Sequence, residues 1–510
     1  MRPKLDARTT TRGKVVRRGL EARIWQLLLF LPPILRASFS MHQMVSRDSK
    51  HHSSFQYSME KETLVIDRTV SDFVRSVEEV DNITTSLRVL LGAAAFRHKE
   101  DDRFQSSDPL VEEARCQRYG FELDTSKPLH RRRTFWGSLI ADDSWHALGI
   151  AAMEYHGLID TIVFVESNTT QTLAPRTMRF SHNSSRKKVL TSPLLWGEQT
   201  RVHVDYYLKE NSNFGNHGLW RENDQRDVII QRWKENGMTE QDVGLISDVD
   251  EVVTRDFLQA LRTCKIPELL PTFKENRTLG HPAGAVIEHY DCLEPKILAN
   301  TLVYEGSPLC RPPSIRWHHP DFIVGGCIEG IGDASLRRTP TPREVAPFGA
   351  YTRLSDWRSK LKNVTLPGST DTVVLGPLWD ANDFRMEAGG RQILGRTKTG
   401  FEIPTAYHFH NFFDSIAMLR RKYVNYGHNV PKAMDLPLSQ IHEDLGFMVD
   451  CLENYSSRQR AGQADWYNLD PVHISPIAFQ KVPAYVRMRH EELQVELASD
   501  DRLHSSKFGD

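Results

Sequence analysis

Apolar and polar positions follow two different periods in the middle of this chain of 510 residues. Apolar side chains from Trp145 to Tyr155 recur at helical spacing, and Gly157 follows as a residue that can close a helix. The next segment, Thr161–Val165, is an almost continuous apolar run, which is typical of a strand buried on both faces of a sheet. This part of the sequence therefore predicts a helix followed by a buried strand.

The same order of elements continues along the chain. Arg201–Asp205 reads as a second strand, and apolar positions between Trp220 and Trp233 predict a helix that ends at Asn236-Gly237. A third strand, Asp242–Ser247, follows. Strands that alternate with helices indicate an α/β fold with a mainly parallel, Rossmann-like central sheet, whose ligand crevice lies at the carboxyl ends of the strands.

Polar side chains stand where two of these strands end. Glu166, Ser167 and Asn168 follow the first strand, and Asp248-Val249-Asp250-Glu251 follows the third. Because the carboxyl ends of parallel strands meet at one edge of a sheet, both groups are expected to face one crevice.

The chain outside this region differs in composition and predicts a division into five parts. Residues 1–23 form a basic tail, 24–35 an apolar segment, 36–112 a polar spacer, 113–455 the catalytic region and 456–510 a C-terminal extension of unreadable role. Within the catalytic region a late helix is predicted over Phe412–Tyr426.

The apolar segment 24–35 is shorter than the roughly 20 residues that a spanning helix usually needs, and it contains Pro32-Pro33. A signal-peptide core and a signal anchor behind a cytoplasmic basic tail both remain open, as does a presequence or a buried helix. The first two imply the secretory pathway and association with a membrane through the N-terminal segment.

Cysteines and glycosylation sequons agree with that address. Six cysteines occur without any Cys-x-x-Cys pair, which argues against a zinc site and allows disulfides of unknown connectivity. Acceptor sequons begin at Asn82, Asn168, Asn183, Asn276, Asn363 and Asn454. Lys plus Arg (65) nearly balances Asp plus Glu (66), so the chain has no overall charge that would attract nucleic acid.

Asp248 and Asp250 are the strongest candidates for chemistry. Transfer of a glycosyl unit from a nucleotide diphosphate requires neutralisation of the leaving diphosphate, and carboxylate oxygens suit Mn²⁺ or Mg²⁺. The alternative for an isolated Asp-x-Asp is an acidic turn or helix cap, and the apolar strand before it favours the metal site.

Other candidates carry two readings each. Glu222 and Arg226 are spaced as a helical ion pair, or Arg226 faces the phosphates or base of a nucleotide. His408 and His410 are expected to point in opposite directions, so that at most one reaches the crevice. Arg420-Arg421-Lys422 reads as a solvated helix face, with phosphate binding as the alternative. A general base is also required, and the candidates are Glu251, Glu288, Asp291 and Asp414.

Four ordered segments resemble the β-1,4-mannosyl-glycoprotein 4-β-N-acetylglucosaminyltransferase family, glycosyltransferase family seventeen. They are Ile162–Thr172, Trp220-x-Glu222-x-x-x-Arg226, Leu245–Glu251 and Tyr407-His408-Phe409-His410, and the likeness covers roughly residues 133–454. The animal members carry a Trp-His-Cys-Ser-Trp-Cys run where this chain has Tyr407–Phe412, and residues 254–404 are largely unlike.

The resemblance implies a GT-A-type fold and an inverting, Mn²⁺-dependent transfer of N-acetylglucosamine from UDP-N-acetylglucosamine to the core mannose of an N-glycan. It also implies a Golgi membrane protein with a lumenal catalytic domain. Carried over by motif, Asp248, Asp250 and His408 are the ion and ribose ligands, and Glu166, Ser167 and Asn168 belong to the nucleotide pocket together with Glu222 and Arg226. Asp250 and Glu251 are the predicted catalytic residues.

Three alternatives stay open at this point. The chain can be a carbohydrate-binding protein that kept the fold without turnover, or a glycosyltransferase with another donor or acceptor. A sugar nucleotidyltransferase would need a Gly-rich basic loop after the first strand, which Glu166-Ser167-Asn168 does not supply.

Overall fold

The structure is a computed structural model of the chain. It describes residues 68–81, 83–96, 108–125, 132–141, 144–208, 218–276, 286–312, 316–334, 336, 361, 363–366, 370–381, 385, 388–426, 429–460 and 475–505. The predicted basic tail 1–23 and apolar segment 24–35 lie outside these residues. All described residues except Arg68 belong to one compact unit, which begins at Thr69.

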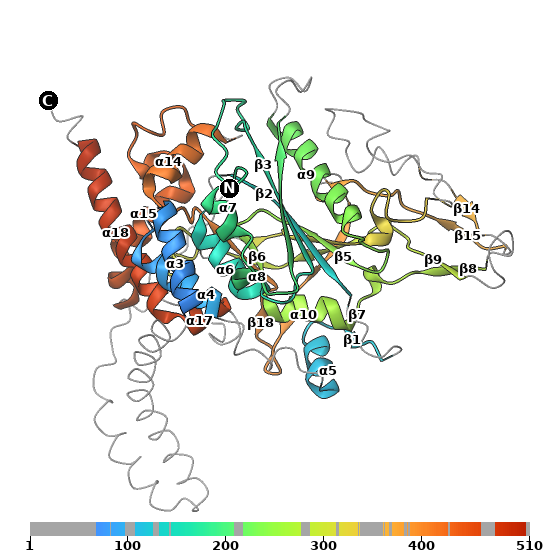
Figure 1. The fold of residues 1–510 in the computed structure, drawn as a ribbon. Coiled ribbons are helices and arrows are strands. Elements are labelled where there is room, and N and C mark those ends of the chain that lie inside the picture. Colours follow the sequence, from blue (N-terminus) through green and yellow to red (C-terminus); the bar gives the residue numbers. More distant parts are fainter. Residues whose placement is uncertain are drawn as a thin grey trace, which may run out of the picture. The chain divides into compact units, whose positions relative to one another are not determined.

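A seven-stranded sheet forms the centre of this unit, with its strands in the order β16-β10-β13-β5-β2-β3-β4 (Figure 1). The bounds are β2 Thr134–Ile140, β3 Thr161–Ser167, β4 Arg201–Tyr207, β5 Val243–Ile246, β10 Lys296–Ala299, β13 Asp321–Val324 and β16 Gly390–Ile393. Strand β13 is antiparallel to both neighbours, and the other neighbours pair in parallel. The predicted α/β fold with a mainly parallel sheet is therefore confirmed.

The three predicted strands correspond to β3, β4 and β5. All seven residues of β3 are buried, as its apolar run indicated. Strand β2, which lies between β5 and β3, was not predicted, because Gly137 and Ser138 interrupt its apolar sequence. The exit of β3 is thus the second strand exit of the sheet, not the first.

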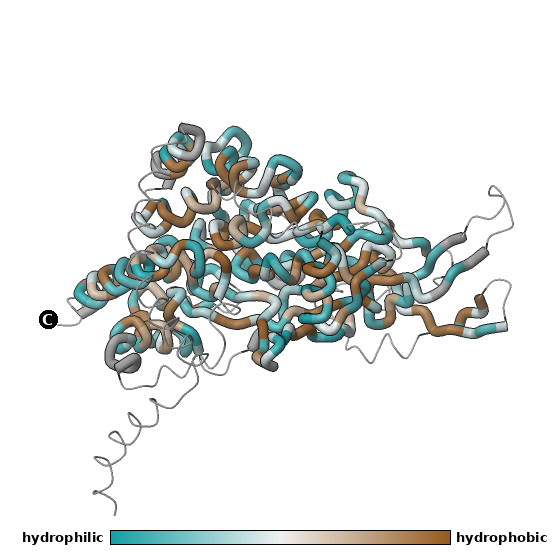
Figure 2. The backbone as a smooth tube through the Cα atoms, turned by 90° about the horizontal axis from the view of Figure 1, so that it is seen from below, coloured by the Kyte–Doolittle hydropathy of each residue, from teal (hydrophilic) through white to brown (hydrophobic). Residues whose placement is uncertain are grey.

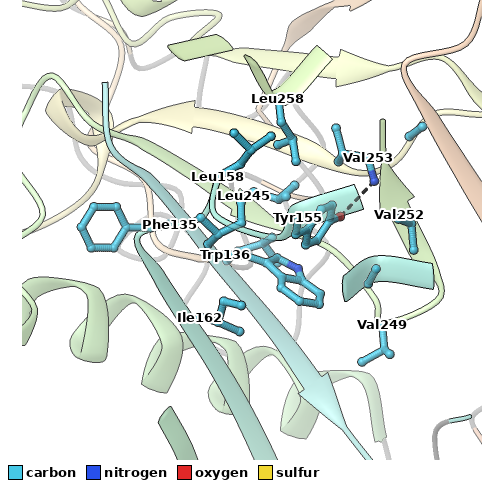
Figure 3. Close-up of a cluster of buried hydrophobic side chains, with 14 of the residues drawn as sticks. Phe135, Trp136, Tyr155, Leu158, Ile162, Leu245, Val249, Val252, Val253 and Leu258 are labelled. Atoms are coloured by element: carbon cyan, nitrogen blue, oxygen red, sulfur yellow. Dashed lines mark hydrogen bonds between the residues drawn. The ribbon is translucent and has the colours of Figure 1, made fainter. Parts of the chain in front are cut away.

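Helices cover both faces of the sheet. Helix α9 (Gly218–Glu235) packs on β2 and β3, where Gly137 leaves room for Ile229. Helices α6 (Trp145–Tyr155) and α8 (Pro193–Trp196) lie on the other face (Figure 1). There Trp136 contacts Tyr155 edge-on (Figure 3) and Trp196 in a tilted arrangement. Trp136 and Gly137 are consecutive residues of β2, so they face opposite sides of the sheet.

A smaller sheet lies beside the first and has the order β12-β11-β19-β6. Its strands are β6 Glu251–Val253, β11 Thr301–Glu305, β12 Arg316–Trp317 and β19 Ala406–His410. Strand β6 begins immediately after Asp250, so the loop after β5 joins the two sheets. The Tyr155 hydroxyl accepts a 2.9 Å hydrogen bond from the Val253 amide and fixes β6 to α6 (Figure 3).

Helices from both ends of the described chain pack together. Helix α4 (Thr85–Phe96) contacts α6 and α18 (Pro483–Ser505), and its Leu87, Leu90 and Leu91 are fully buried. The expectation of a loosely packed spacer over 36–112 is therefore wrong for α4, whose apolar side chains complete the main core. The predicted C-terminal extension likewise supplies packed helices.

The remaining helices are α3 Arg68–Asp81, α5 Pro109–Arg118, α7 Ser185–Leu190, α10 Arg255–Thr263, α14 Ile416–Asn425, α15 Glu443–Arg460 and α17 Ile477–Lys481. The short strands are β1 Glu122–Leu123, β7 Cys264–Lys265, β8 Phe273–Asn276, β9 Val286–His289, β14 Asn363–Thr365, β15 Thr372–Val374, β17 Gly395–Arg396 and β18 Glu402–Ile403. Brown and teal positions alternate along the helices in Figure 2, as expected for elements with one buried side. Among the described residues, no helix combines the length and the apolar character that crossing a bilayer requires.

Three disulfides use all six cysteines and supply the connectivity that the sequence left open. They join Cys116 to Cys264, Cys292 to Cys327 and Cys310 to Cys451. The third bond ties the chain that follows β11 to α15 across 141 residues. Two of the three bonds therefore link segments that are far apart in sequence.

A glycine on β5 gives a test of the packing beneath the loop. A Cβ at Gly244 would lie 2.4 Å from a ring carbon of Trp233, so Gly244→Ala is expected to lower the free energy of unfolding by about 1–3 kcal/mol. Denaturant unfolding measures this change. Gly92→Ala in α4 is the matched control, because a Cβ at Gly92 would lie 3.7 Å from a methyl carbon of Val74, which is an ordinary contact distance. A gain of about 0.5–1 kcal/mol is expected there, and equal effects of the two variants would contradict this account.

Candidate active site

The loop between the two sheets carries the Asp-Val-Asp motif. Val249 is buried and points into the core (Figure 3), whereas the side chains of Asp248 and Asp250 are 48% and 26% exposed. The Phe409 amide donates to the Asp250 carbonyl at 2.7 Å, which links the loop to β19. Anchored by its central valine, the loop presents two carboxylates at the carboxyl end of β5.

Glu251 supports this loop from below. Its carboxylate is buried, accepts the Asp248 amide at 2.9 Å and forms a two-pronged ion pair with Arg385, both contacts at 3.0 Å. Burial raises the pKa of Glu251, but Arg385, together with His319 and His408, outweighs burial, so the net shift is downward and the group is a carboxylate at neutral pH. An enclosed, paired carboxylate fits a positioning role better than the catalytic role predicted for it.

Asp248 lies between two guanidinium groups. Its Oδ1 is 3.4 Å from Arg226 Nη2, and its Oδ2 is 3.2 Å from Arg385 Nη2. Arg226 also pairs with Glu222, whose other oxygen accepts from Gln171 at 2.7 Å. The predicted helical ion pair between Glu222 and Arg226 is therefore present, and Arg226 also reaches the Asp-Val-Asp loop; its contact with a nucleotide stays a prediction.

The exit of β3 has a different organisation from the one expected. Glu166 is buried and accepts from the backbone amides of Arg179 and Phe180 at 2.5 and 2.9 Å, with Arg176 Nη2 at 3.3 Å. Its carboxylate thus shapes the loop after β3 and does not present itself to a ligand. Ser167 stands at the strand end.

Asn168 follows directly, and its Oδ1 is enclosed without a hydrogen-bond partner. The residue as a whole is half-buried, so the alternatives of a pocket residue and a glycosylated asparagine both stay predictions at this position. Of the other sequon asparagines, Asn183, Asn363 and Asn454 are exposed, Asn82 lies outside the described residues, and nothing is described of the Asn276 side chain.

The two histidines of β19 lie side by side, with ring centroids 5.1 Å apart. The expectation that they point in opposite directions is wrong, because residues two apart on a strand project to the same face. His408 Nε2 is 3.6 Å from Asp250 Oδ2, and His410 Nδ1 is 2.9 Å from Glu305 Oε1. Both imidazoles therefore belong to the site.

Charge couples His408 to the loop. Burial lowers the pKa of His408, but the carboxylates of Asp250, Glu251 and Glu305 together outweigh burial, and the net shift is upward. Conversely, burial raises the pKa of Asp250, and His408 brings it below its ordinary value. The pair is an ionic contact that a divalent cation, bound to the same nitrogen and oxygen, would replace.

Glu305 and Asp444 were not predicted, because each enters the site through tertiary packing. Glu305 ends β11, Asp444 begins α15, and with His410 they bring one ligand atom each to within 4.8 Å of one another. Glu305 also accepts from Asn411 Nδ2 at 3.0 Å. Burial raises the pKa of Glu305 to about 7, despite the opposing charges of His408 and Lys422.

The other carboxylates predicted as candidates for the general base lie away from the Asp-Val-Asp loop. Glu288 lies on the β8–β9 hairpin and pairs with Lys274 at 3.0 Å. Asp414 accepts from the Ser144 hydroxyl and the Trp145 amide, both at 2.9 Å. Asp291 lines a separate pocket of about 260 Å³ beside the Cys292–Cys327 disulfide. None of these three carboxylates has a described contact with Asp248 or Asp250.

The predicted basic face of the late helix is also different from expectation. Arg420 is buried, pairs with Asp500 of α18 and donates to the carbonyls of Ala433 and Leu436. It is not part of a solvated face. Lys422 donates to Asn411 Oδ1 at 3.2 Å, so this cation lies next to the Glu305 group.

The residues present suit a hard divalent cation. Asp250 Oδ2 and His408 Nε2 converge and are partly exposed, and oxygen with imidazole nitrogen is an accepted ligand set for Mn²⁺. Asp248 is open to solvent on one side but faces two arginines, so it is a weaker ligand than Asp250 and is better placed for hydroxyl groups. A divalent cation bound here would be held by Asp250 and His408, with Asp248 beside it.

A carboxylate loop at the end of a buried parallel strand, with an imidazole across from it, is the arrangement expected of a glycosyltransferase. The comparison with family models makes the assignment specific, because residues 63–274 match glycosyltransferase family 17. The matched family is the one that the motifs of the sequence resemble, so the resemblance is confirmed over these residues. A search of curated proteins gave no match.

The matched region ends at β8. It contains the exits of β3 and β5 and the helix with Glu222 and Arg226, whereas His408, Glu305 and Arg385 lie beyond it. The family match supports a glycosyltransferase, and the second half of the candidate site is defined by the structure.

Removal of Arg385 tests the support of the loop. Arg385→Met would leave Glu251 buried without its cation, so we expect a loss of about 3–5 kcal/mol in the free energy of unfolding, measured in urea. Arg391→Met removes a half-exposed arginine paired with Glu268, and a loss below about 1 kcal/mol is expected. Similar losses in both variants would refute the special role of the buried pair.

The raised pKa of Glu305 predicts a pH dependence. Because the folded protein holds this proton up to about pH 7 while the unfolded chain releases it near its ordinary pKa, this group makes folding less favourable as pH rises between those values. Glu305→Gln mimics the protonated form. Its melting temperature relative to the unmodified protein should therefore increase from pH 5 to pH 8, and a constant difference would contradict the shift.

Proposed function

We propose that this protein transfers N-acetylglucosamine from UDP-N-acetylglucosamine to a mannose of an N-glycan, with inversion and in a Mn²⁺-dependent reaction. The observation that carries the proposal is the Asp248-Val249-Asp250 loop in a family 17 chain, with His408 Nε2 3.6 Å from Asp250 Oδ2. The bound ion would neutralise the charge that develops on the departing diphosphate.

The protein's own residues have separate tasks in this proposal. Asp250 and His408 hold the ion, with Mg²⁺ as a substitute, and Asp248 accepts hydrogen bonds from donor hydroxyls beside Arg226. Glu251 and Arg385 keep the loop in place, which spares the site the cost of ordering it at each turnover. The Ser167 and Asn168 end of β3 receives the nucleoside.

The fold and address belong to the same proposal. The seven-stranded order, with one antiparallel strand and Asp-Val-Asp after β5, supports a GT-A-type domain. Three disulfides that use every cysteine support an oxidising compartment, as expected for a lumenal Golgi domain behind an N-terminal anchor. The acceptor class follows from the family resemblance.

The test uses the purified full chain with several UDP-sugars and a panel of N-glycan acceptors, with and without Mn²⁺. Products are read by mass, and the linkage by NMR. Metal-dependent formation of one β-linked N-acetylglucosamine on mannose is the expected result. Another transferred sugar or another acceptor would correct the specificity. Absence of both transfer and donor hydrolysis, with retained glycan binding, would replace the enzyme by a carbohydrate-binding protein.

Asp250→Asn isolates the role of the ion. Loss of a metal ligand removes several kcal/mol of charge stabilisation, so the rate should fall at least about a hundredfold, and UDP binding should lose its response to Mn²⁺. Asp371→Asn makes the same chemical change in an exposed loop and should leave both unchanged. Metal-responsive UDP binding in Asp250→Asn would remove Asp250 from the ion site.

A further inference from the structure

Arg221 is a buried cation at the predicted nucleotide end of the crevice that sequence reasoning did not select. It lies in the first turn of α9, at the carboxyl ends of β3 and β4, and only 2% of it is exposed. Its Nη2 is 3.5 Å from Ser167 Oγ, and its guanidinium carbon is 5.2 Å from the centre of the Tyr207 ring. The side chain thus borders the exit of β3.

The charge of Arg221 has no carboxylate counterpart among the described residues. Its Nε is enclosed and has no hydrogen-bond partner, and the contact with Ser167 is at the long limit for a hydrogen bond. Arg226 and Arg385, by comparison, each pair with carboxylates. Burying a guanidinium whose donors are unused costs free energy, and hydrogen bonds to a ligand oxygen would offset this cost.

The site residues lie in a definite order from one end of the crevice to the other. Asp250 and His408 mark the metal end, Asp248 and Arg226 follow, and Arg221 lies at β3, two strands from β5 in the sheet. Two strand spacings correspond to about 10 Å, roughly the separation of a diphosphate from its base in an extended nucleotide. With the diphosphate at the metal, the base falls at β3.

We infer that Arg221 selects the nucleobase of the donor by donating hydrogen bonds to a carbonyl oxygen of uracil. Position 4 of uracil is a carbonyl acceptor, whereas position 4 of cytosine is an amino donor, which a guanidinium would oppose. Asn168 Oδ1, also without a partner at this strand end, is an acceptor of the kind that the uracil N3–H group would use. The inference rests on the proposed function, because that function sets the diphosphate at Asp250.

The experiment measures binding of UDP and CDP to the full chain in the presence of Mn²⁺ by calorimetry. The unmodified protein should prefer UDP. Arg221→Gln should weaken UDP binding about ten- to a hundredfold, the value of a hydrogen bond to a charged group, and should not weaken CDP binding, because the donor that opposes the cytosine amino group is removed. Arg221→Lys should also lose the preference, because a single ammonium lacks the planar set of donors. Arg232→Gln on the same helix, where Arg232 pairs with Asp205 and Glu235, is the control and should keep it.

Each other result has a defined meaning. Equal weakening of UDP and CDP in Arg221→Gln, with recovery in Arg221→Lys, would show that Arg221 binds phosphate and would overturn the inference. If Arg221→Gln keeps the preference for UDP, the inference is overturned too. The melting temperature of the variant shows that it is folded. If the unmodified protein binds neither nucleotide, the proposed function itself fails, which is a distinct outcome from loss of base selection.

Discussion

The ion pair between Glu251 and Arg385 is the interaction on which the site depends. It closes the turn that leads from the large sheet into the small one, and through the Asp248 amide it also fixes the motif. A buried pair of this kind is rarely a large source of net stability, because desolvation offsets the attraction. Its value here is conformational, since both exposed carboxylates take their direction from it.

The sequence allowed prediction of the parts that depend on local pattern. The apolar run of β3 and the strand before Asp248 required a buried parallel sheet, and the sheet rule then brought their polar exits to one edge. Strand β2 was not predicted because Gly137 interrupts its apolar run. The glycine is needed there because it leaves room for α9 to pack on the strand. Helix α4 was predicted to belong to a spacer because the helices against which it packs, α6 and α18, are distant from it in sequence.

The rest of the site could not be predicted from local pattern. Arg385, Glu305 and Asp444 come from three separate segments, and no spacing rule links an arginine to a glutamate 134 residues earlier. Glu166 shows the opposite error, because a polar residue at a strand exit was assigned to a ligand although it binds backbone amides. Strand-exit position therefore predicts where polar groups gather but not which of them remain available.

The order of strands in the small sheet has a consequence for biosynthesis. Strand β19 lies between β11 and β6, so β6 has no partner in this sheet, and β11 pairs only with β12, until residues 406–410 have left the ribosome. A nascent chain that already contains both aspartates still lacks the imidazole and the strand that holds the loop. The contact between Asp250 and His408 therefore forms late in translation, and a product truncated after the region that matches family 17 would lack it.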